Sequence, residues 1–463
     1  MRASSTAISR FLLVAFTTAI SARVAGQELP PVPAVGMAAS AREALQRLAL
    51  SSDDTSDAPV PPETKNDDSV FVDPAVGPAA WLQQPAMEPP APTGQVRRTT
   101  RGSRQANVGL ASVPNMFGDL AGATASVRTE FNPALSVGGG SQFGKGTINL
   151  PMAGGGSRVG KISENDSPIP RDRIFFNYNH FQNVIQLSET PAAPPGPPLM
   201  RQEPIDRYTM GFEKTFLDGW TSVEVRMPLQ GQIDSQLQTV GLNSNSVGNL
   251  TVVLKSLLFM NYSTAVGAGM AIETPTGGDT FVRLSTANLQ FQNQAPHLLP
   301  YIGFVWSPGD PRWGWGSGLF LTGFAQIDIN ASSNTIDVLG PSHSAIGTLG
   351  KLTDQNLGFL DIAAGYWIYR DPDAPRLTGI AAVTELHYTT TLQNADQING
   401  TVNGTAINLN ATGNRFDVLN GTIGVQFLLF DASSLRVAGV FPLGGDDRRL
   451  FDSEVQVQFN RRF

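Results

Sequence analysis

A histidine close to a carboxylate is the clearest candidate for chemistry in this sequence. Glu385 and His387 stand two residues apart, and this spacing puts both side chains on one face of a β-strand. A histidine that serves as a general base needs a nucleophile or a carboxylate beside it. No serine can be assigned as that nucleophile from the sequence, so we favour a paired, non-catalytic histidine over a hydrolase centre.

Other kinds of chemistry are not predicted. The chain has no cysteine, and its other histidines, His180, His297 and His343, have no metal-ligand spacing. Residues 139–145 imitate a phosphate-binding loop, but Gly146 stands where a serine or threonine should hold magnesium. We therefore expect no catalytic residue, no cofactor and no metal. The formal net charge of −7 argues against nucleic acid as a partner.

The end of the chain shows which elements must position such side chains. Residues 451–463 alternate between mainly apolar odd positions, with Arg461 breaking the pattern, and polar even positions, which is the pattern of a β-strand. Val455, Val457, Phe459 and the last residue, Phe463, share one face. This stretch resembles the C-terminal signature of Gram-negative outer-membrane barrels, and the resemblance implies that these four residues are the signal for the barrel-assembly machinery. No run of 18 apolar residues is present, so any membrane crossing must be made by strands.

Alternation of this kind recurs along residues 172–463 and predicts an all-β, antiparallel transmembrane barrel of about twelve strands. An even number of strands lets the last strand pair with the first. The expected strands cover 173–184, 206–216, 220–229, 249–259, 265–274, 297–306, 315–330, 356–370, 377–390, 416–430, 434–443 and 451–463.

The connections between these strands alternate in length. Long connections are expected at 186–205, 230–248, 275–296, 331–355 and 391–415, and short ones at 217–219, 260–264, 307–314, 371–376 and 431–433. Outer-membrane barrels have long outer loops and short periplasmic turns, so the alternation favours a barrel over a soluble sandwich.

The N-terminal part of the chain reads differently. Residues 1–26 carry Arg2 and Arg10 beside an apolar run and small residues, which predicts a secretory signal peptide. Residues 27–106 are rich in proline and predict a disordered periplasmic segment, with one short helix at 38–50. This segment is a candidate for contact with the cell wall. Residues 107–171 are rich in glycine and form either a lead-in to the first strand or a plug in the lumen.

The parity of the terminal strand predicts which side chains line the lumen. Charges of both signs are expected inside, so the lumen should be hydrated and have no marked ion preference. The residues expected to line the lumen are Asn177, Asn179, Arg207, Glu213, Glu224, Arg226, Gln326, Asp328, Asp361, Glu385, His387, Gln426, Arg436, Glu454, Gln456, Gln458 and Arg462.

Aromatic residues near strand ends suit either interfacial girdles or ordinary loop packing. Phe359, Trp367 and Tyr369 share the parity of Asp361, so their strand either presents aromatic rings to the lumen or shifts register at a bulge. The girdle candidates are Trp220, Trp306, Trp313, Trp315, Trp367 and Tyr388.

Segments at 361–369, 385–390 and 416–463 are similar to genome-predicted barrels of the phenol-degradation MetA-pathway type. This resemblance implies an outer-membrane porin or transporter that passes small solutes and is surrounded by outer-membrane lipid. A structural or surface-binding barrel with a blocked lumen is the alternative, and an outer-membrane hydrolase is the third. Conductance of the purified protein, or loss of activity on His387→Ala, distinguishes the three.

Overall fold

The computed structural model describes residues 110, 112–119, 127–133, 146–150 and 160–463, the last range with gaps at 190–196, 238–239, 245–246, 285–287, 310, 341–342, 395, 403–404, 410–414, 416, 431 and 446–448. The chain divides into units 1–93 and 94–463, and all described residues belong to the second. The predicted signal peptide, disordered segment, 38–50 helix and 139–145 loop lie outside the described residues. Within those residues, no helix is long and apolar enough to cross a membrane.

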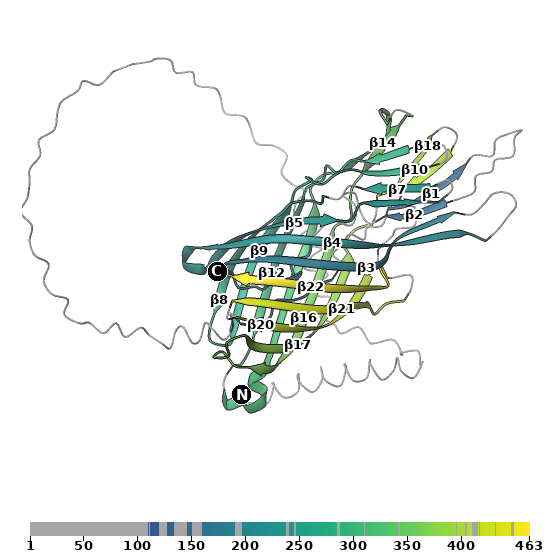
Figure 1. Ribbon diagram of the computed structural model, residues 1–463. Coiled ribbons are helices and arrows are strands. Elements are labelled where there is room, and N and C mark those ends of the chain that lie inside the picture. The colour runs from purple at the N-terminus through teal and green to yellow at the C-terminus, as the bar shows by residue number, and fades with distance from the viewer. Residues whose placement is uncertain are drawn as a thin grey trace, which may run out of the picture. The chain divides into compact units, whose positions relative to one another are not determined.

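Twelve antiparallel strands form a closed barrel, as the sequence predicted, because β22 pairs with β3 and β3 pairs with β4. The strands follow one another around the wall in sequence order (Figure 1). Their bounds are β3 (Arg173–Glu189), β4 (Leu199–Phe216), β5 (Thr221–Gln230), β8 (Thr251–Met260), β9 (Thr264–Glu273), β12 (His297–Trp306), β13 (Leu319–Asn330), β16 (Leu357–Arg370), β17 (Leu377–Thr391), β20 (Asp417–Leu429), β21 (Ser433–Pro442) and β22 (Ser453–Arg462).

The short connections all lie at one end of the barrel, which we call the turn end, and the long connections lie at the opposite end, the loop end. Phe463 follows β22 at the turn end. The 3-10 turn η1 (Leu217–Gly219) joins β4 to β5 with Leu217 and Asp218 at positive φ, as a tight hairpin turn requires. A second 3-10 segment, η2 (Pro311–Gly318), delays β13 to Leu319, so the predicted start at residue 315 was wrong.

The long connections contain strands that the sequence did not reveal. Four of them form hairpins at the loop end, where the labels of β7, β10, β14 and β18 gather in Figure 1. Six of these strands make a second sheet in the order β15-β14-β11-β10-β7-β6. The hairpin strands are β6 (Ile233–Gln236), β7 (Val240–Ser244), β10 (Thr280–Leu284), β11 (Asn288–Phe291), β14 (Asn334–Leu339), β15 (Ala345–Leu352), β18 (Ile398–Val402) and β19 (Thr405–Leu409).

Two further strands, β1 (Val127–Pro133) and β2 (Gly146–Leu150), come from the glycine-rich segment that precedes the barrel. They pair with each other, and they also join the main sheet between β19 and β3. The segment is therefore more than a lead-in, because part of it belongs to the wall at the loop end.

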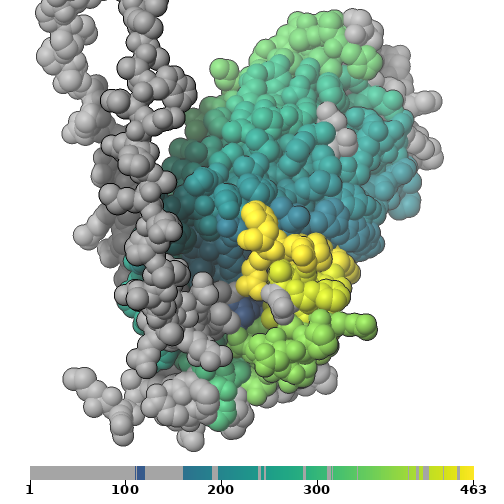
Figure 2. Space-filling model, turned by 60° about the vertical axis from the view of Figure 1, so that its left-hand side comes forward, coloured from purple at the N-terminus to yellow at the C-terminus, as the bar shows by residue number. Residues whose placement is uncertain are grey.

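Period-two alternation decides which side chains face inward. In β22 the even positions Glu454, Gln456 and Gln458 are buried, whereas Val455 and Phe459 on the odd positions are exposed on the outside. Figure 2 shows this last strand, in yellow, on the outer surface of the molecule. This strand thus turns its polar face to the interior and its apolar face outward, the reverse of a strand in a soluble sheet.

The aromatic residues of β16 show both outcomes that the sequence left open, rings that face the interior and a shift of register at a bulge. Phe359 and Trp367 are buried in the interior, and the pairing with β17 then shifts register between Trp367 and Tyr369. The bulge turns Tyr369 outward, where it is exposed. Trp367 packs against Phe320 and so does not belong to an interfacial girdle.

Among the other girdle candidates, Trp220 and Tyr388 are exposed on the outside and Trp306 is half-buried. The side chains of Trp313 and Trp315 lie outside the described residues.

Two apolar clusters fill different parts of the interior. The first, which we call the loop-end core, lies among β3, the loop-end hairpins and Phe451, and it includes Phe181, Leu289 and Phe291. The second lies at the level of the strand region and includes Met116 and Phe117, which precede the barrel in the sequence. The interior therefore holds a packed apolar cluster at both levels.

Candidate functional site

The predicted lumen residues, apart from Arg462, are all buried in the interior, and Arg462 is half-buried close to the turn end. The carboxylates and guanidinium groups that we expected to be hydrated instead contact two stretches of the glycine-rich segment. We call residues 112–119 the first arm and residues 160–171 the second arm. Both arms lie against the inward face of the barrel strands.

Backbone groups of the first arm bind side chains of four strands. The amides of Phe117 and Gly118 donate to the carboxylate of Glu385, at 2.7 and 3.0 Å. Arg436 donates to the carbonyls of Asn115 and Met116, and its guanidinium lies 4.0 Å from the ring centre of Phe117. The wall thus supplies the partners that the extended backbone of the arm needs.

The contacts of the first arm shift from the turn end toward the loop end as the chain proceeds. Its carbonyl at Asn115 meets Arg436, which stands near the turn-end start of β21. Its far end, Asp119, accepts a hydrogen bond from Asn420, which stands near the loop-end start of β20, at 2.7 Å. The first arm therefore runs from the turn end toward the loop end.

The second arm carries acidic side chains that pair with cations of the wall. The carboxylate of Asp166 contacts Arg173 at 3.1 Å, Arg226 at 3.2 Å and Lys255 at 2.6 Å. Glu164 pairs with Arg207 at 2.8 Å. The same cations also contact wall carboxylates, so the wall and the arm share one ion-pair network whose members are all buried.

The second arm runs in the opposite direction, from the loop end to the turn end. Gln326, in the loop-end half of β13, accepts from the amide of Ile162 at 2.8 Å. The amide of Arg171 donates to Glu213, near the turn end of β4, at 3.1 Å. The two arms therefore run antiparallel to each other through the lumen.

The arms also bind each other. Lys161 of the second arm lies 2.5 Å from Asp119 of the first and 2.8 Å from Asp361 of the wall. Gly118 has φ near +81°, and a Cβ placed there would come within 2.6 Å of the Cα of Glu164. Only glycine fits this close approach, because it lacks the Cβ and tolerates positive φ.

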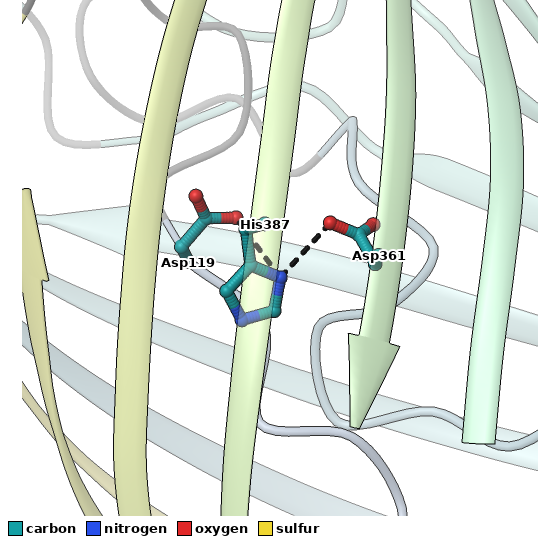
Figure 3. A group of neighbouring side chains, drawn as sticks. All are labelled: Asp119, Asp361 and His387. Carbon is teal, nitrogen blue, oxygen red and sulfur yellow. Dashed lines mark hydrogen bonds and ion pairs between the residues drawn. The ribbon is translucent and has the colours of Figure 1, made fainter. Parts of the chain in front are cut away.

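The predicted pair of Glu385 and His387 belongs to this contact region, and Figure 3 shows His387 between Asp119 and Asp361. His387 Nδ1 lies 2.9 Å from Asp361 on the neighbouring strand and 3.7 Å from Asp119 of the first arm. His387 Nε2 lies 3.1 Å from Glu385 and 3.2 Å from the hydroxyl of Thr422. Glu385 and His387 are thus within contact distance of each other, and the sequence analysis did not identify Asp119 and Thr422 as their partners.

Carboxylate, imidazole and hydroxyl in this order resemble a nucleophilic triad. The surroundings argue against such a role. Thr422 and His387 are both buried, and the first arm covers them with the carbonyl of Gly118, 3.5 Å from the Thr422 hydroxyl. A substrate carbonyl would need the space that the arm fills.

Two groups of acidic and histidine side chains have the proximity of metal ligands. One is Asp119, Asp361 and His387, and the other is Asp166, Glu213 and Glu224. In both groups an amino or guanidinium group lies among the carboxylates, Lys161 in the first and Lys255 with two arginines in the second. The arrangement is therefore that of ion-pair networks, in which protein cations occupy the central positions.

Several members of these networks escaped the sequence analysis. Arg173 shares the parity of Asn177 and was recognisable as inward-facing. Lys255 was harder to assign, because it shares its inward face with the apolar residues Val253 and Leu257, so this strand has no clearly polar face. The arm residues Lys161, Glu164 and Asp166 stand in a stretch without strand periodicity, and only their density of charge within a glycine-rich segment marked them.

No family model matches this chain, and no curated protein matches it. Solved structures with similar folds include the NanC porin, at 9% identity, covering 63% of this chain and 98% of that one, with a TM-score of 0.32. The COG4313 outer membrane channel from Pseudomonas putida F1 has 12% identity, 64% and 96% coverage and a TM-score of 0.37. The toluene transporter TodX from Pseudomonas putida has 8% identity, 64% and 92% coverage and a TM-score of 0.32. At these values the likeness carries no argument about function.

Proposed function

We propose that this chain is an outer-membrane channel for small solutes, held closed by its own two arms. The observation that carries the proposal is the separation of wall and obstruction. The wall is a closed twelve-stranded barrel with many polar inward side chains, and the arms that bind them belong to a separate stretch of chain. The arms also bury apolar side chains such as Met116 and Phe117 against the wall. Their departure therefore exchanges polar contacts for water and exposes this apolar surface, while the strand pairing of the wall stays intact.

The exterior supports the outer-membrane location. Large apolar side chains are exposed around the barrel, a surface that a water-soluble monomer rarely shows. We propose that this surface contacts lipid, and that Val455, Val457, Phe459 and Phe463 are read by the barrel-assembly machinery. The exposed residues include Ile174, Met210, Phe212, Ile302, Phe304, Ile362, Ile423, Val437 and Phe459.

The solute class follows from the wall and from the family resemblance together. Both signs of charge line the interior, so neither cations nor anions are favoured. Similarity to the phenol-degradation barrels favours small organic compounds. We also propose that residues 27–106 remain in the periplasm, where they are available for contact with the cell wall.

The direct test is conductance in a planar bilayer, for the chain from Gln27 and for a version that begins at Asp172. Heat-shifted gel mobility first shows that both have folded as barrels. We expect brief, infrequent openings from the longer chain and steady current from the shorter one. Silence from both folded proteins would overturn the channel proposal.

A surface-binding barrel with a blocked lumen is the second candidate, and the loop-end core favours it. Phe181, Leu289 and Phe291 close the interior there with apolar side chains that water cannot replace. Under this alternative, removal of the arms leaves the barrel silent. The conductance of the version from Asp172 therefore separates the two functions.

A further inference from the structure

The hairpin of β1 and β2 occupies an unusual place in the wall. At the loop end the strand order runs β18-β19-β1-β2-β3, so the hairpin fills the position between β19 and β3. β1 pairs with β19 from Thr129↔Leu409 to Pro133↔Thr405, and β2 pairs with β3 from Gly146↔Glu189 to Asn149↔Gln186. We call this hairpin the strap.

The strap closes a sector that the barrel strands leave open. β3 continues seven residues beyond Gln182, its last partner in β22, because β22 begins at Ser453. β20 begins and β21 ends near this level, and the connection from β21 to β22 adds no strand among the described residues. Without the strap, the upper part of β3 would face β19 across a gap.

The strap is also the middle of the chain that fills the lumen. It lies between the two arms in the sequence, after residue 119 and before residue 160. The first arm rises toward the loop end and the second returns to the turn end, as their contacts with Asn420 and Glu213 show. The chain therefore enters at the turn end, adds two strands to the wall at the loop end and returns.

The pairing of the strap is short compared with that of the permanent wall. Its junction with β3 has four residue pairs, whereas β22 and β3 share ten. Release of the strap breaks few ladder hydrogen bonds, and the arms that flank it are held by hydrogen bonds and ion pairs together with buried apolar residues such as Met116 and Phe117. A short ladder opens at lower cost than a long one.

We propose that the strap and the two arms form one gate, in which detachment of the strap from β19 and β3 opens the side of the loop end while the arms leave the lumen. This inference deepens the proposed channel function and rests on it. It places the outer opening in the sector between β19 and β3. The loop-end core, which closes the other sectors, then stays intact during transport.

Because the sequence contains no cysteine, two introduced cysteines have no other thiol in the chain with which to form a disulfide. Asn132→Cys with Ala406→Cys would bind the strap to β19, and Thr147→Cys with Ser188→Cys would bind it to β3, since these residues are register partners. Partners across an antiparallel ladder have Cα atoms about 4.5 to 5.5 Å apart, within the range that a disulfide spans. Phe281→Cys with Gln290→Cys, partners in the β10-β11 hairpin, is the matched control at the same end.

Conductance of the full chain from Gln27 is recorded for each pair, oxidised and then reduced with dithiothreitol. We expect openings of both strap-locked variants to fall at least about tenfold when oxidised and to return on reduction, a factor that corresponds to about 1.4 kcal/mol. The control should conduct equally in both states. Equal opening frequencies of the oxidised and reduced strap variants would contradict the gate proposal but leave the channel proposal intact.

Hydrogen exchange of the unmodified protein gives a readout that does not depend on current. If the strap detaches, amides of β1 and β2 should exchange at least about tenfold faster than those of β10 and β11. If the unmodified chain shows no openings, this exchange decides the matter. Equal protection of the two hairpins from hydrogen exchange would then contradict the proposal that the strap detaches. This conclusion holds whether or not the chain from Asp172 conducts.

Discussion

The two levels of the barrel interior are closed by different physics. In the strand region the arms and the wall meet through an apolar cluster that includes Phe117, and also through many buried hydrogen bonds and ion pairs, such as those of Asp166 with Arg173, Arg226 and Lys255. At the loop end the hairpins meet through apolar side chains such as Leu289 and Phe291.

The difference matters because water can replace a lost hydrogen-bond or ion-pair partner. An apolar ring that becomes exposed to water gains no such replacement. We therefore expect the first level to open and the second to hold the structure together. Substitutions at the two levels should separate these roles, with stability lost at one and closure lost at the other.

The largest effect on stability is expected in the loop-end core. Phe291→Ala removes a buried aromatic ring and should lower the free energy of unfolding by about 3–5 kcal/mol. Denaturant unfolding followed by tryptophan fluorescence measures it. Phe281→Ala, in the neighbouring strand of the same sheet, removes an exposed ring and is the control. An equal loss in both variants would mean that the loop-end core is not a packed core.

The next largest effect should fall on closure. Asp166→Asn keeps the volume of the side chain but removes the charge that binds the second arm to three cations. Hydrogen bonds to charged groups contribute about 1.5–3 kcal/mol each, so we expect the frequency of channel openings to rise at least tenfold.

The barrel should survive the Asp166→Asn change, because the same cations keep Glu213 and Glu224 as partners. An unfolding midpoint that falls as far as that of Phe291→Ala would erase the distinction between the two levels.

Close packing of the two arms gives a third prediction. Gly118→Ala forces an L-residue into a left-handed conformation, which costs about 1–2 kcal/mol, and puts a Cβ against the backbone of Glu164. We expect more frequent openings. Gly219→Ala has a similar φ, of +86°, but no heavy atom within 4 Å, so it tests strain alone. Equal openings of the two glycine variants would show that the arms do not need their close contact.

The smallest effect is expected at the rim of the turn end. Partial burial would raise the pKa of Asp172, but hydrogen bonds from Thr215 and Lys214 outweigh it and lower the pKa below its ordinary value. Stability from this carboxylate is therefore present above its ordinary pKa and lost as the pH falls through the lowered value.

Lys214→Met should cost less than about 1 kcal/mol, because the ion pair of Lys214 with Asp172 is partly exposed. It should leave the openings unchanged. Unfolding of both proteins between pH 6 and pH 2 measures the difference, and a loss as large as that of Asp166→Asn would contradict the ranking.

The strand region could be predicted from the sequence because alternation, turn residues and an apolar C-terminal strand all reflect the same barrel. The parity of Glu454, Gln456 and Gln458 carried over to the other strands, since every strand has the same period. Pro300 lies inside the predicted strand 297–306, and β12 accommodates it with a local loss of pairing to β13 between Leu298 and Tyr301, because proline has no amide to donate.

The filling of the lumen could not be predicted in the same way. The arms have no secondary-structure period, and their partners lie up to 341 residues away in the sequence, as Phe117 and Gln458 show. The loop-end hairpins were hidden for a related reason. Strands of four to six residues, such as Ile233–Gln236, are too short for alternation to stand out from chance.

The central claim is that the lumen is closed by the arms packed against the wall side chains, and that the wall alone does not close it. Gln456→Cys puts a single thiol at a position that is buried and that contacts the carbonyl of Gly118. Its reaction with a water-soluble maleimide is compared in the folded chain from Gln27 and in the folded chain from Asp172. The account predicts slow modification in the first and fast modification in the second. Equally fast modification in both would show that the lumen is open, and equally slow modification would show that the wall closes itself.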